Sequence, residues 1–177
     1  GGRRFKFGGS DYRNVGKGEV ALILHAHLPY VRSDEVGSLE EDWFFQELFE
    51  CYLPLIELLE VASKDPKQNP KLTLSLSPTL LSLLNDPGLK KKFPKWLEVR
   101  LDLLNSQNLD DNEASDHLAN LISKQINQWH NFDGDLITRL INLEKSKVVD
   151  LLTCAATHGY LPLLREHPES ILGQLRT

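Results

Sequence analysis

Cysteine, long apolar runs and excess positive charge are all scarce in this sequence, and each shortage excludes a class of protein. The 177 residues include two cysteines, Cys51 and Cys154, and neither has a CxxC or Cys/His ligand spacing around it. A disulfide framework and a cysteine-ligated zinc site are therefore not expected, and the thiols are predicted to be buried and reduced. No apolar run approaches the roughly 18 residues of a membrane span, and no signal-peptide core is evident. We expect a cytoplasmic protein without a membrane partner.

Charge patterning gives no sign of a nucleic-acid partner. The chain carries 25 acidic and 20 basic residues, for a formal charge of −5, and both signs are spread along it. The one basic cluster, Lys90 to Lys92, lacks the interleaved aromatic residues of a nucleic-acid surface. With 41% apolar side chains, the chain is long enough to bury the core of one globular domain or a large part of one.

An alternation of strands and helices begins after a Gly-rich, basic stretch that has no periodicity. We interpret residues 1–18 as a flexible lead-in and residues 19–177 as the folded part. Short apolar or alternating runs predict three strands, separated by segments with helical periodicity. The predicted strands are residues 19–24, 71–77 and 147–154. This order favours parallel strands with right-handed helical crossovers, in an α/β layer or barrel.

Local signals mark where the predicted helices begin and bend. Ser38, three residues before a glutamate, has the spacing of a capping box ahead of a core-facing helix, and Pro54 predicts a bend within that helix. Ser77 precedes a proline and predicts a helix that starts as soon as the second strand ends. Residues 88–147 are helical in pattern apart from polar breaks, and Asp133 is expected to cap a new helix at one of them.

Histidines follow two of the predicted strands at their carboxyl ends. His25 and His27 come directly after the first strand, and His158 lies four residues beyond the third. In parallel α/β folds, ligands bind at this edge of the sheet. The residues alone leave three interpretations open: rim residues bonded to the backbone, ligands of a hydrolytic zinc ion, or hydrogen-bond partners of a polar substrate such as a sugar.

A resemblance to a known family is carried by four segments: LILHAHLPYV, LEEDWFFQELFECYLPLI, LTLSLSPTLLSLL and DLLTCAATHGYLPLL. In this order they resemble the N-terminal part of a glycoside hydrolase family 57 protein, and the last is most similar to the α-1,4-glucan branching enzyme subgroup. The resemblance implies the first three strands of an incomplete (β/α)7 barrel with long helical insertions. It also implies retaining glycosyl transfer on α-glucans such as glycogen or starch, with no metal or organic cofactor.

The same resemblance assigns candidate substrate-binding residues. His25 and His158 match family positions that hydrogen-bond the sugar at the cleavage point, and His27 matches a neighbouring position of the first motif. Trp43 falls where the family has an aromatic residue near the glucan groove. Its place on an apolar helical stripe equally predicts a core residue.

The two catalytic carboxyl groups of the family have no counterpart in this chain. A retaining glycosidase needs a nucleophile and an acid/base about 5 to 5.5 Å apart, and the family segments that carry them are not resembled anywhere here. The acidic run Glu40–Asp42 is typical of a helix N-terminus and is not a substitute. We therefore predict a chain that is inactive alone, either a split subunit whose remaining barrel is supplied in trans or a fragment of a longer chain. A metal-dependent hydrolase that uses the three histidines and a non-catalytic glucan-binding remnant are the alternatives.

An unfinished barrel also predicts which apolar side chains are left uncovered. Three strands cannot close into a barrel, so the inward face of the sheet lacks its opposite wall. We expect this face to carry Leu22, Leu24, Leu74 and Leu76.

Overall fold

The chain folds around one three-stranded sheet with helices between the strands. The computed structural model describes residues 20–32, 38–65, 71–106 and 113–176, so the predicted lead-in lies outside the described residues. Within these ranges, no helix is long and apolar enough to cross a membrane. In chain order the elements are β1 (Ile23–Ala26), α1 (Leu39–Glu47), η1 (Leu48–Tyr52), α2 (Leu53–Ser63), β2 (Leu72–Leu76), α3 (Pro78–Asn85), α4 (Pro87–Ser106), α5 (Glu113–Asn131), α6 (Leu136–Lys145), β3 (Val149–Thr153), η2 (Leu161–Leu164) and α7 (Pro168–Leu175).

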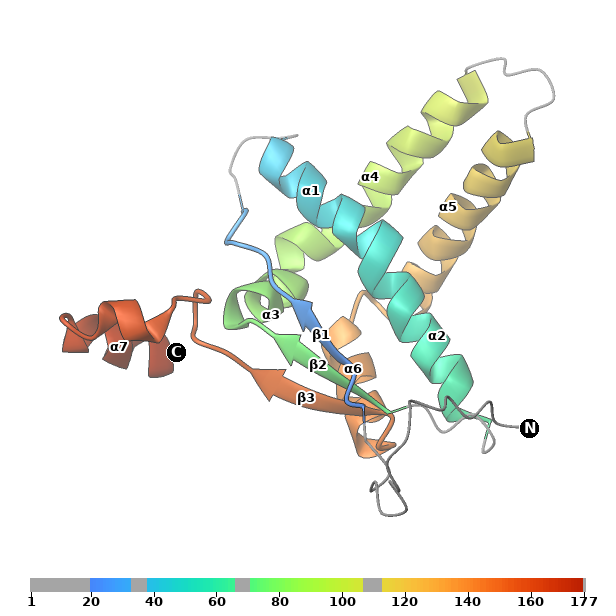
Figure 1. The fold of residues 1–177 in the computed structure, drawn as a ribbon. Coiled ribbons are helices and arrows are strands. Elements are labelled where there is room, and N and C mark those ends of the chain that lie inside the picture. The colour runs from blue at the N-terminus through green and yellow to red at the C-terminus, as the bar shows by residue number, and fades with distance from the viewer. Residues whose placement is uncertain (1–19, 33–37, 66–70, 107–112, 177) are drawn as a thin grey trace, which may run out of the picture.

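The sheet is parallel throughout, in the order β1-β2-β3 (Figure 1). Its register places Leu24 opposite Leu74, and Leu74 opposite Leu151. Each connection between neighbouring strands contains helices, as parallel pairing requires. The predicted α/β class, with parallel strands and long helical insertions, is confirmed.

The two faces of the sheet differ in what covers them. Side chains of α2, α3 and α6 pack over one face, where Leu74 and Leu76 are 4% and 6% exposed. Ile23 and Leu152 lie at the alternate positions, on what we call the open face, and are 57% and 49% exposed. Side chains alternate with period two along a strand, so the leucines of β2 face the helices. The prediction that Leu74 and Leu76 lack a covering wall is therefore wrong. The apolar side chains that are left uncovered are those of Ile23 and Leu152.

β1 is shorter and more exposed than its apolar sequence predicts. The strand begins at Ile23 and not at residue 19, while Val20 and Leu22 before it are 97% and 60% exposed. A continuous apolar run is typical of a strand that is covered on both faces, but β1 lies at the edge of this sheet. The shift places His25 inside the strand ladder, opposite Ser75.

A π-helical turn, η1, joins α1 to α2 directly ahead of Pro54. The N–H of Leu53 donates to the carbonyl of Leu48, five residues back. Proline has no N–H to donate, and its ring crowds the carbonyl four residues before it. A wider turn accommodates both effects. The bend predicted at Pro54 stays a prediction.

Two of the predicted helix caps are confirmed and one is wrong. The hydroxyls of Ser38 and Ser77 each accept a backbone N–H three residues later, at the starts of α1 and α3. The cap of α6 is Asp135 and not Asp133. Asp133 and Gly134 have φ values of 52° and 64° and form the left-handed turn that follows α5, so the capping position falls two residues later than predicted.

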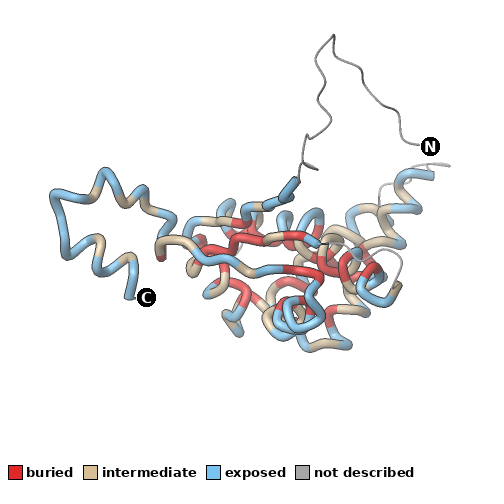
Figure 2. The backbone as a smooth tube through the Cα atoms, turned by 60° about the horizontal axis from the view of Figure 1, so that its bottom comes forward, coloured by how far each residue is buried: buried red, intermediate tan, exposed pale blue. Residues whose placement is uncertain are grey.

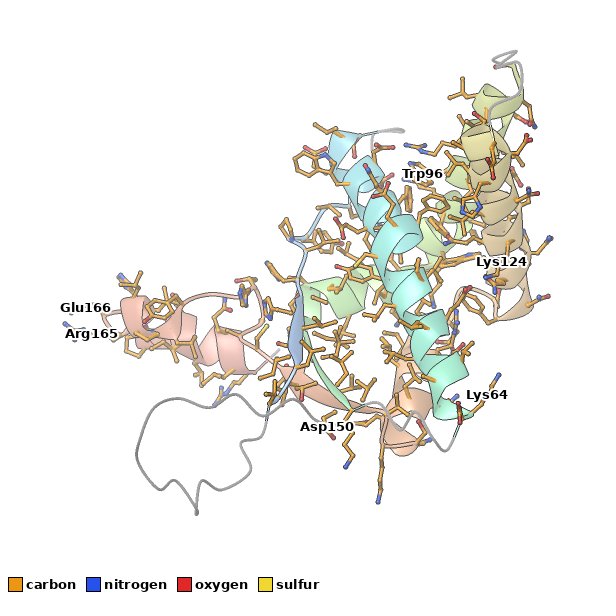
Figure 3. All side chains as sticks on the ribbon, turned by 45° about the vertical axis from the view of Figure 1, so that its right-hand side comes forward. Lys64, Trp96, Lys124, Asp150, Arg165 and Glu166 are labelled. Atoms are coloured by element: carbon orange, nitrogen blue, oxygen red, sulfur yellow. The ribbon has the colours of Figure 1, made fainter. Side chains whose placement is uncertain are left out.

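Aromatic rings pack α4 against α1 and α5. The ring of Phe93, which is fully buried, lies 4.6 Å from Trp129, 5.8 Å from Phe45 and 6.0 Å from Trp96, measured between centroids. Figure 3 labels Trp96 on α4, and the guanidinium of Arg100 covers its ring at 3.3 Å. These contacts extend the core from the sheet into the α4–α5 pair.

Glu41 ties α1 to α4 and carries a prediction about stability. Glu41 is 2% exposed, and both of its carboxylate oxygens accept hydrogen bonds from the ammonium group of Lys92, each at 2.8 Å. Because Lys92 is 40% exposed, the loss on Glu41→Ala should fall below that of a fully buried pair, at about 1–3 kcal/mol of unfolding free energy. Urea unfolding measures this loss. The control Glu40→Ala, exposed in the same turn, should cost less than about 0.5 kcal/mol, and equal losses would contradict the prediction.

The last described segment stands apart from the core. η2 and α7 contain no buried residue, and Leu163 and Leu175 are 77% and 64% exposed. Figures 1 and 2 show this segment projecting beyond the end of β3, and Arg165 and Glu166 mark its tip in Figure 3. We call residues 161–175 the η2–α7 arm.

Candidate functional site

Two strand ends bring three histidines to one edge of the sheet. His25 is in β1, and His27 follows two residues later, so strand alternation directs both rings to the same side. His158 reaches this edge from the loop after β3, where its N–H donates to the carbonyl of Ala155 at 2.7 Å. Its φ of 59° is left-handed, which is uncommon for a residue other than glycine and is typical of functional sites.

The three rings form one contact group, which we call the imidazole cluster. The Nε2 atoms of His25 and His158 are 3.1 Å apart, and the ring centroids of this pair are 4.4 Å apart. The centroid of His27 lies 4.7 Å from that of His158 and 6.5 Å from that of His25. His158 is therefore the ring that contacts both of the others.

The neutral form of His27 is favoured in the imidazole cluster. Burial lowers the pKa of His27, and the neighbouring His158 and His25 lower it further. His25 and His158 are exposed, and a hydrogen bond between their Nε2 atoms needs one nitrogen that donates and one that accepts. The cluster therefore offers solvent-accessible donors and acceptors to a ligand, while Nδ1 of His27 is buried with no hydrogen-bond partner among the described residues. Such a set suits the hydroxyl groups of a neutral polar ligand.

The loops that carry the imidazole cluster are held by two side chains that the sequence did not single out. Thr79, at the start of α3, donates to the carbonyl of Leu28 at 2.9 Å and so fixes the chain directly after His27. Gln174 of α7 accepts the N–H of Thr157 at 2.9 Å and donates to its hydroxyl at 2.8 Å. The helix-start pattern around Thr79 is a signal that could have found it. No sequence pattern could have identified Gln174, because its contact with Thr157 forms only when the η2–α7 arm folds.

Trp43 lies on the exposed side of α1, outside the imidazole cluster. It is 52% exposed, whereas Phe44 and Phe45 beside it are 1% and 4% exposed. The prediction of a core tryptophan is therefore wrong, because the two phenylalanines define the buried face of the helix. Within the described ranges, no ring contact joins Trp43 to a histidine. Its role near a glucan groove stays a prediction.

The two cysteines are less buried than predicted. Cys51 is exposed, Cys154 is half-buried, and both thiols are free. Burial of part of the Cys51 side chain raises the pKa of its thiol, and Glu47 raises it further. The π turn places Cys51 beside the cavity under His25 and not in the core.

Two residues of the acidic run at the start of α1, Glu41 and Asp42, are bonded to α4 and not to the imidazole cluster. Asp42 accepts hydrogen bonds from the indole of Trp96 at 2.6 Å and the guanidinium of Arg100 at 2.7 Å. Burial raises the pKa of Asp42, but these two hydrogen bonds and the charge of Arg100 outweigh it and lower the pKa overall. In the part of the chain that the structure describes, no group of three or more His, Cys, Asp and Glu side chains is arranged to hold a metal ion.

A parallel sheet with helices between its strands and polar rings at its carboxyl edge is typical of α/β proteins that bind a ligand at that edge, in layered as well as barrel folds. Residues 21–177 match the sequence model of glycosyl hydrolase family 57, and the chain belongs to this family. The family predicted from the four sequence segments is confirmed. Because this is a family of enzymes, the chain is an enzyme by family membership.

Two curated relatives are branching enzymes. A 1,4-alpha-glucan branching enzyme of Thermococcus kodakarensis is 32% identical over 151 residues, which make up 84% of this chain and 22% of that protein. A probable 1,4-alpha-glucan branching enzyme of Mycobacterium tuberculosis is 31% identical over 80 residues, 45% of this chain and 15% of that protein. The chain thus spans less than a quarter of the length of the first relative.

Solved structures give the same fold. A branching enzyme of this family from Pyrococcus horikoshii matches with a TM-score of 0.79 and 31% identity, over 88% of this chain and 30% of that chain. The alpha-amylase AmyC from Thermotoga maritima matches with a TM-score of 0.79 and 26% identity, over the same shares. The predicted origin of the fold, one part of a family 57 barrel, agrees with these matches.

Proposed function

We propose that the chain is the N-terminal part of a 1,4-α-glucan branching enzyme, which acts on glycogen- or starch-type α-glucan by retaining glycosyl transfer. The observation that carries the proposal is the imidazole cluster at the carboxyl edge of the sheet, in a chain 32% identical to a branching enzyme. Neutral imidazole rings supply both a donor and an acceptor to sugar hydroxyls. Glycogen biosynthesis in the cytoplasm is the setting that we propose for this activity.

Each candidate residue has a role in this proposal that its position supports. The exposed rings of His25 and His158 face a ligand and hydrogen-bond the hydroxyls of the sugar at the cleavage point. His27 is more enclosed and holds the loop and the neighbouring ring. Trp43 offers an exposed, flat apolar surface to a glucan chain outside the imidazole cluster.

A polypeptide that carries the rest of the barrel is the second partner that we propose. β1 and β3 each have one edge without a strand neighbour among the described residues, and an open edge of this kind is a template for further strands. Ile23 and Leu152 expose apolar side chains beside these edges. In the Pyrococcus horikoshii structure the matched part is 30% of the chain, so most of that protein lies outside the matched part.

Reconstitution tests the proposed function. We expect the 177-residue chain alone to form no branches, because none of its segments resembles those that carry the family's two catalytic carboxyl groups. Mixing it with a polypeptide that carries the remainder of the Thermococcus kodakarensis relative should restore branching, measured as α-1,6 linkages in amylose by ¹H NMR. The double variant Ile23→Lys, Leu152→Lys should prevent reconstitution, and the exposed Val99→Lys on α4 should not.

The outcomes separate this proposal from its alternatives. Branching by the chain alone would contradict the predicted need for a partner. A stable complex that binds maltooligosaccharide without turnover would instead favour a glucan-binding remnant. Hydrolysis that depends on added zinc would favour the metal-dependent hydrolase.

A further inference from the structure

Two hydroxyl groups at the junction of β2 and α3 form a chain of hydrogen bonds that ends beside His27. The hydroxyl of Thr79 donates to the carbonyl of Leu28 at 2.9 Å, and its oxygen lies 3.1 Å from that of Ser77. The N–H of Leu80 donates to the Ser77 oxygen at 3.3 Å. We call this chain of groups, from Leu80 through Ser77 and Thr79 to Leu28, the hydroxyl relay.

The direction of each hydrogen bond in the hydroxyl relay follows from the protons that are available. A carbonyl oxygen only accepts, so the single hydroxyl proton of Thr79 is committed to Leu28. Thr79 therefore accepts from Ser77, whose own oxygen accepts the N–H of Leu80. Each hydroxyl thus donates once and accepts once, an arrangement in which neighbouring hydrogen bonds polarise and strengthen one another. Because Ser77 is fully buried, loss of the Thr79 hydroxyl would leave that of Ser77 without its acceptor, away from water.

The segment that the hydroxyl relay reaches is the one that carries His27. The N–H of Ser77 donates to the carbonyl of Ala26 at 3.2 Å, so the residues on both sides of His27 are bonded to the start of α3, directly after β2 (Figure 1). The side chain of Leu28 also packs against the hydrophobic core. The backbone on either side of His27 is therefore fixed, at Ala26 and at Leu28.

The ring of His27 depends on this backbone for its place in the imidazole cluster. Its Nδ1 atom is buried and has no hydrogen-bond partner among the described residues, so no bond at this atom orients the ring. The ring centroid lies 4.7 Å from that of His158, whose Nε2 is 3.1 Å from that of His25. A displacement of His27 therefore changes the contact that holds His158 beside it.

We propose that Ser77 and Thr79 are positioning residues for the imidazole cluster: the hydroxyl relay sets the place of His27 and, through ring contact, that of His158. Both hydroxyls act through His27 and not through a contact of their own with a ligand. That this placement serves glycosyl transfer rests on the proposed function. The placement itself requires no glucan.

NMR on the 177-residue chain without glucan tests the placement. Thr79→Val keeps the shape of the side chain and removes the hydroxyl, so the ring-proton signals of His27 should shift, and the nuclear Overhauser contact between the rings of His27 and His158 should weaken. Thr79→Ser keeps the hydroxyl and should give the signals of the unaltered chain. The indole signal of Trp129, in the core, should stay in place in every variant and so report that the fold is intact.

Matched variants keep this result interpretable. Ser82 is exposed on the same helix, and its hydroxyl donates to the carbonyl of Pro78 at 3.0 Å, so Ser82→Ala should leave the His27 signals unchanged. Thr79→Ala, which is smaller than valine, should act as Thr79→Val does and covers the case in which valine disturbs the start of α3. Unchanged His27 signals in both variants, or an equal change in Thr79→Ser, would overturn the proposal.

Kinetics of the reconstituted enzyme separate positioning from stability. Thr79→Val should lower kcat by about 10-fold with a much smaller change in KM, because misplaced rings bond the transition state less well. Thr79→Ser should restore the rate, and an unchanged kcat in Thr79→Val would overturn the positioning role in the reaction. Failure of the unaltered reconstituted enzyme to branch would contradict the proposed function, whereas the NMR comparison would still decide the placement.

Discussion

His25→Ala and His158→Ala should each lower kcat of the reconstituted enzyme by about 10²-fold or more, with a much smaller change in KM. The two rings lie at the carboxyl edge of the sheet with their Nε2 atoms 3.1 Å apart, where each can hydrogen-bond a sugar hydroxyl. Such bonds strengthen as the sugar ring flattens toward its oxocarbenium-like transition state. Removing them therefore acts on the rate of the bound complex more than on binding. Steady-state kinetics on amylose measures both constants.

The controls for this prediction separate a sugar ligand from a metal ligand and from a structural residue. His130→Ala, exposed on α5, should leave kcat unchanged, and His27→Ala should cost less than either of the other two. We expect activity to persist in the presence of a chelator. Loss of activity with a chelator and recovery with zinc would show that the histidines are metal ligands. An unchanged kcat in both alanine variants would show that they are structural.

Phe93→Ala should lower the free energy of unfolding by about 3–5 kcal/mol, which corresponds to roughly 6 to 20 °C in Tm for a chain of this size. Phe93 is fully buried, and its ring contacts Phe45 of α1 and Trp129 of α5. The substitution removes the apolar surface that joins three helices and leaves a cavity that rigid neighbours cannot fill. Chemical denaturation followed by tryptophan fluorescence measures the loss.

The matched control for Phe93 lies on the same helix. Val99 of α4 is 57% exposed, so Val99→Ala should change the unfolding free energy by less than about 0.5 kcal/mol. A loss below about 1 kcal/mol for Phe93→Ala would mean that α4 and α5 are not part of the cooperative core.

The fold was predictable where local chemistry decides the structure. Ser38 and Ser77 cap helices as their spacing predicts, since an N-cap depends on a few neighbouring residues. The parallel order of the strands followed from the helices between them. The start of β1 and the exposure of Ile23 were not predictable in this way, because they depend on which strand is available to pair and on what covers the sheet.

The candidate site was likewise predictable in part from the sequence. The two strand ends predicted that His25, His27 and His158 share one edge of the sheet, and the parallel register brings them into ring contact. The 3.1 Å contact between the Nε2 atoms of His25 and His158 and the left-handed turn at His158 could not be predicted, since they depend on distances and torsion angles within a fraction of an ångström or a few degrees. The exposure of Trp43 also escaped prediction, because Phe44 and Phe45 compete with it for the buried face of one helix.

The π turn at Leu48–Tyr52 means that the first long helix contains one residue more than its core face requires. A regular α-helix turns by 3.6 residues, and the wider turn absorbs the additional residue while Phe45 before it and Ile56 after it both remain buried. A helix shortened by one position at Cys51 would therefore keep its buried stripe. The extra residue instead extends the lining of the cavity of about 190 Å³ beside His25, which Cys51 and Tyr52 both line. The extra residue in the helix that covers the sheet thus helps to shape the cavity beside His25, at the edge where the three histidines lie.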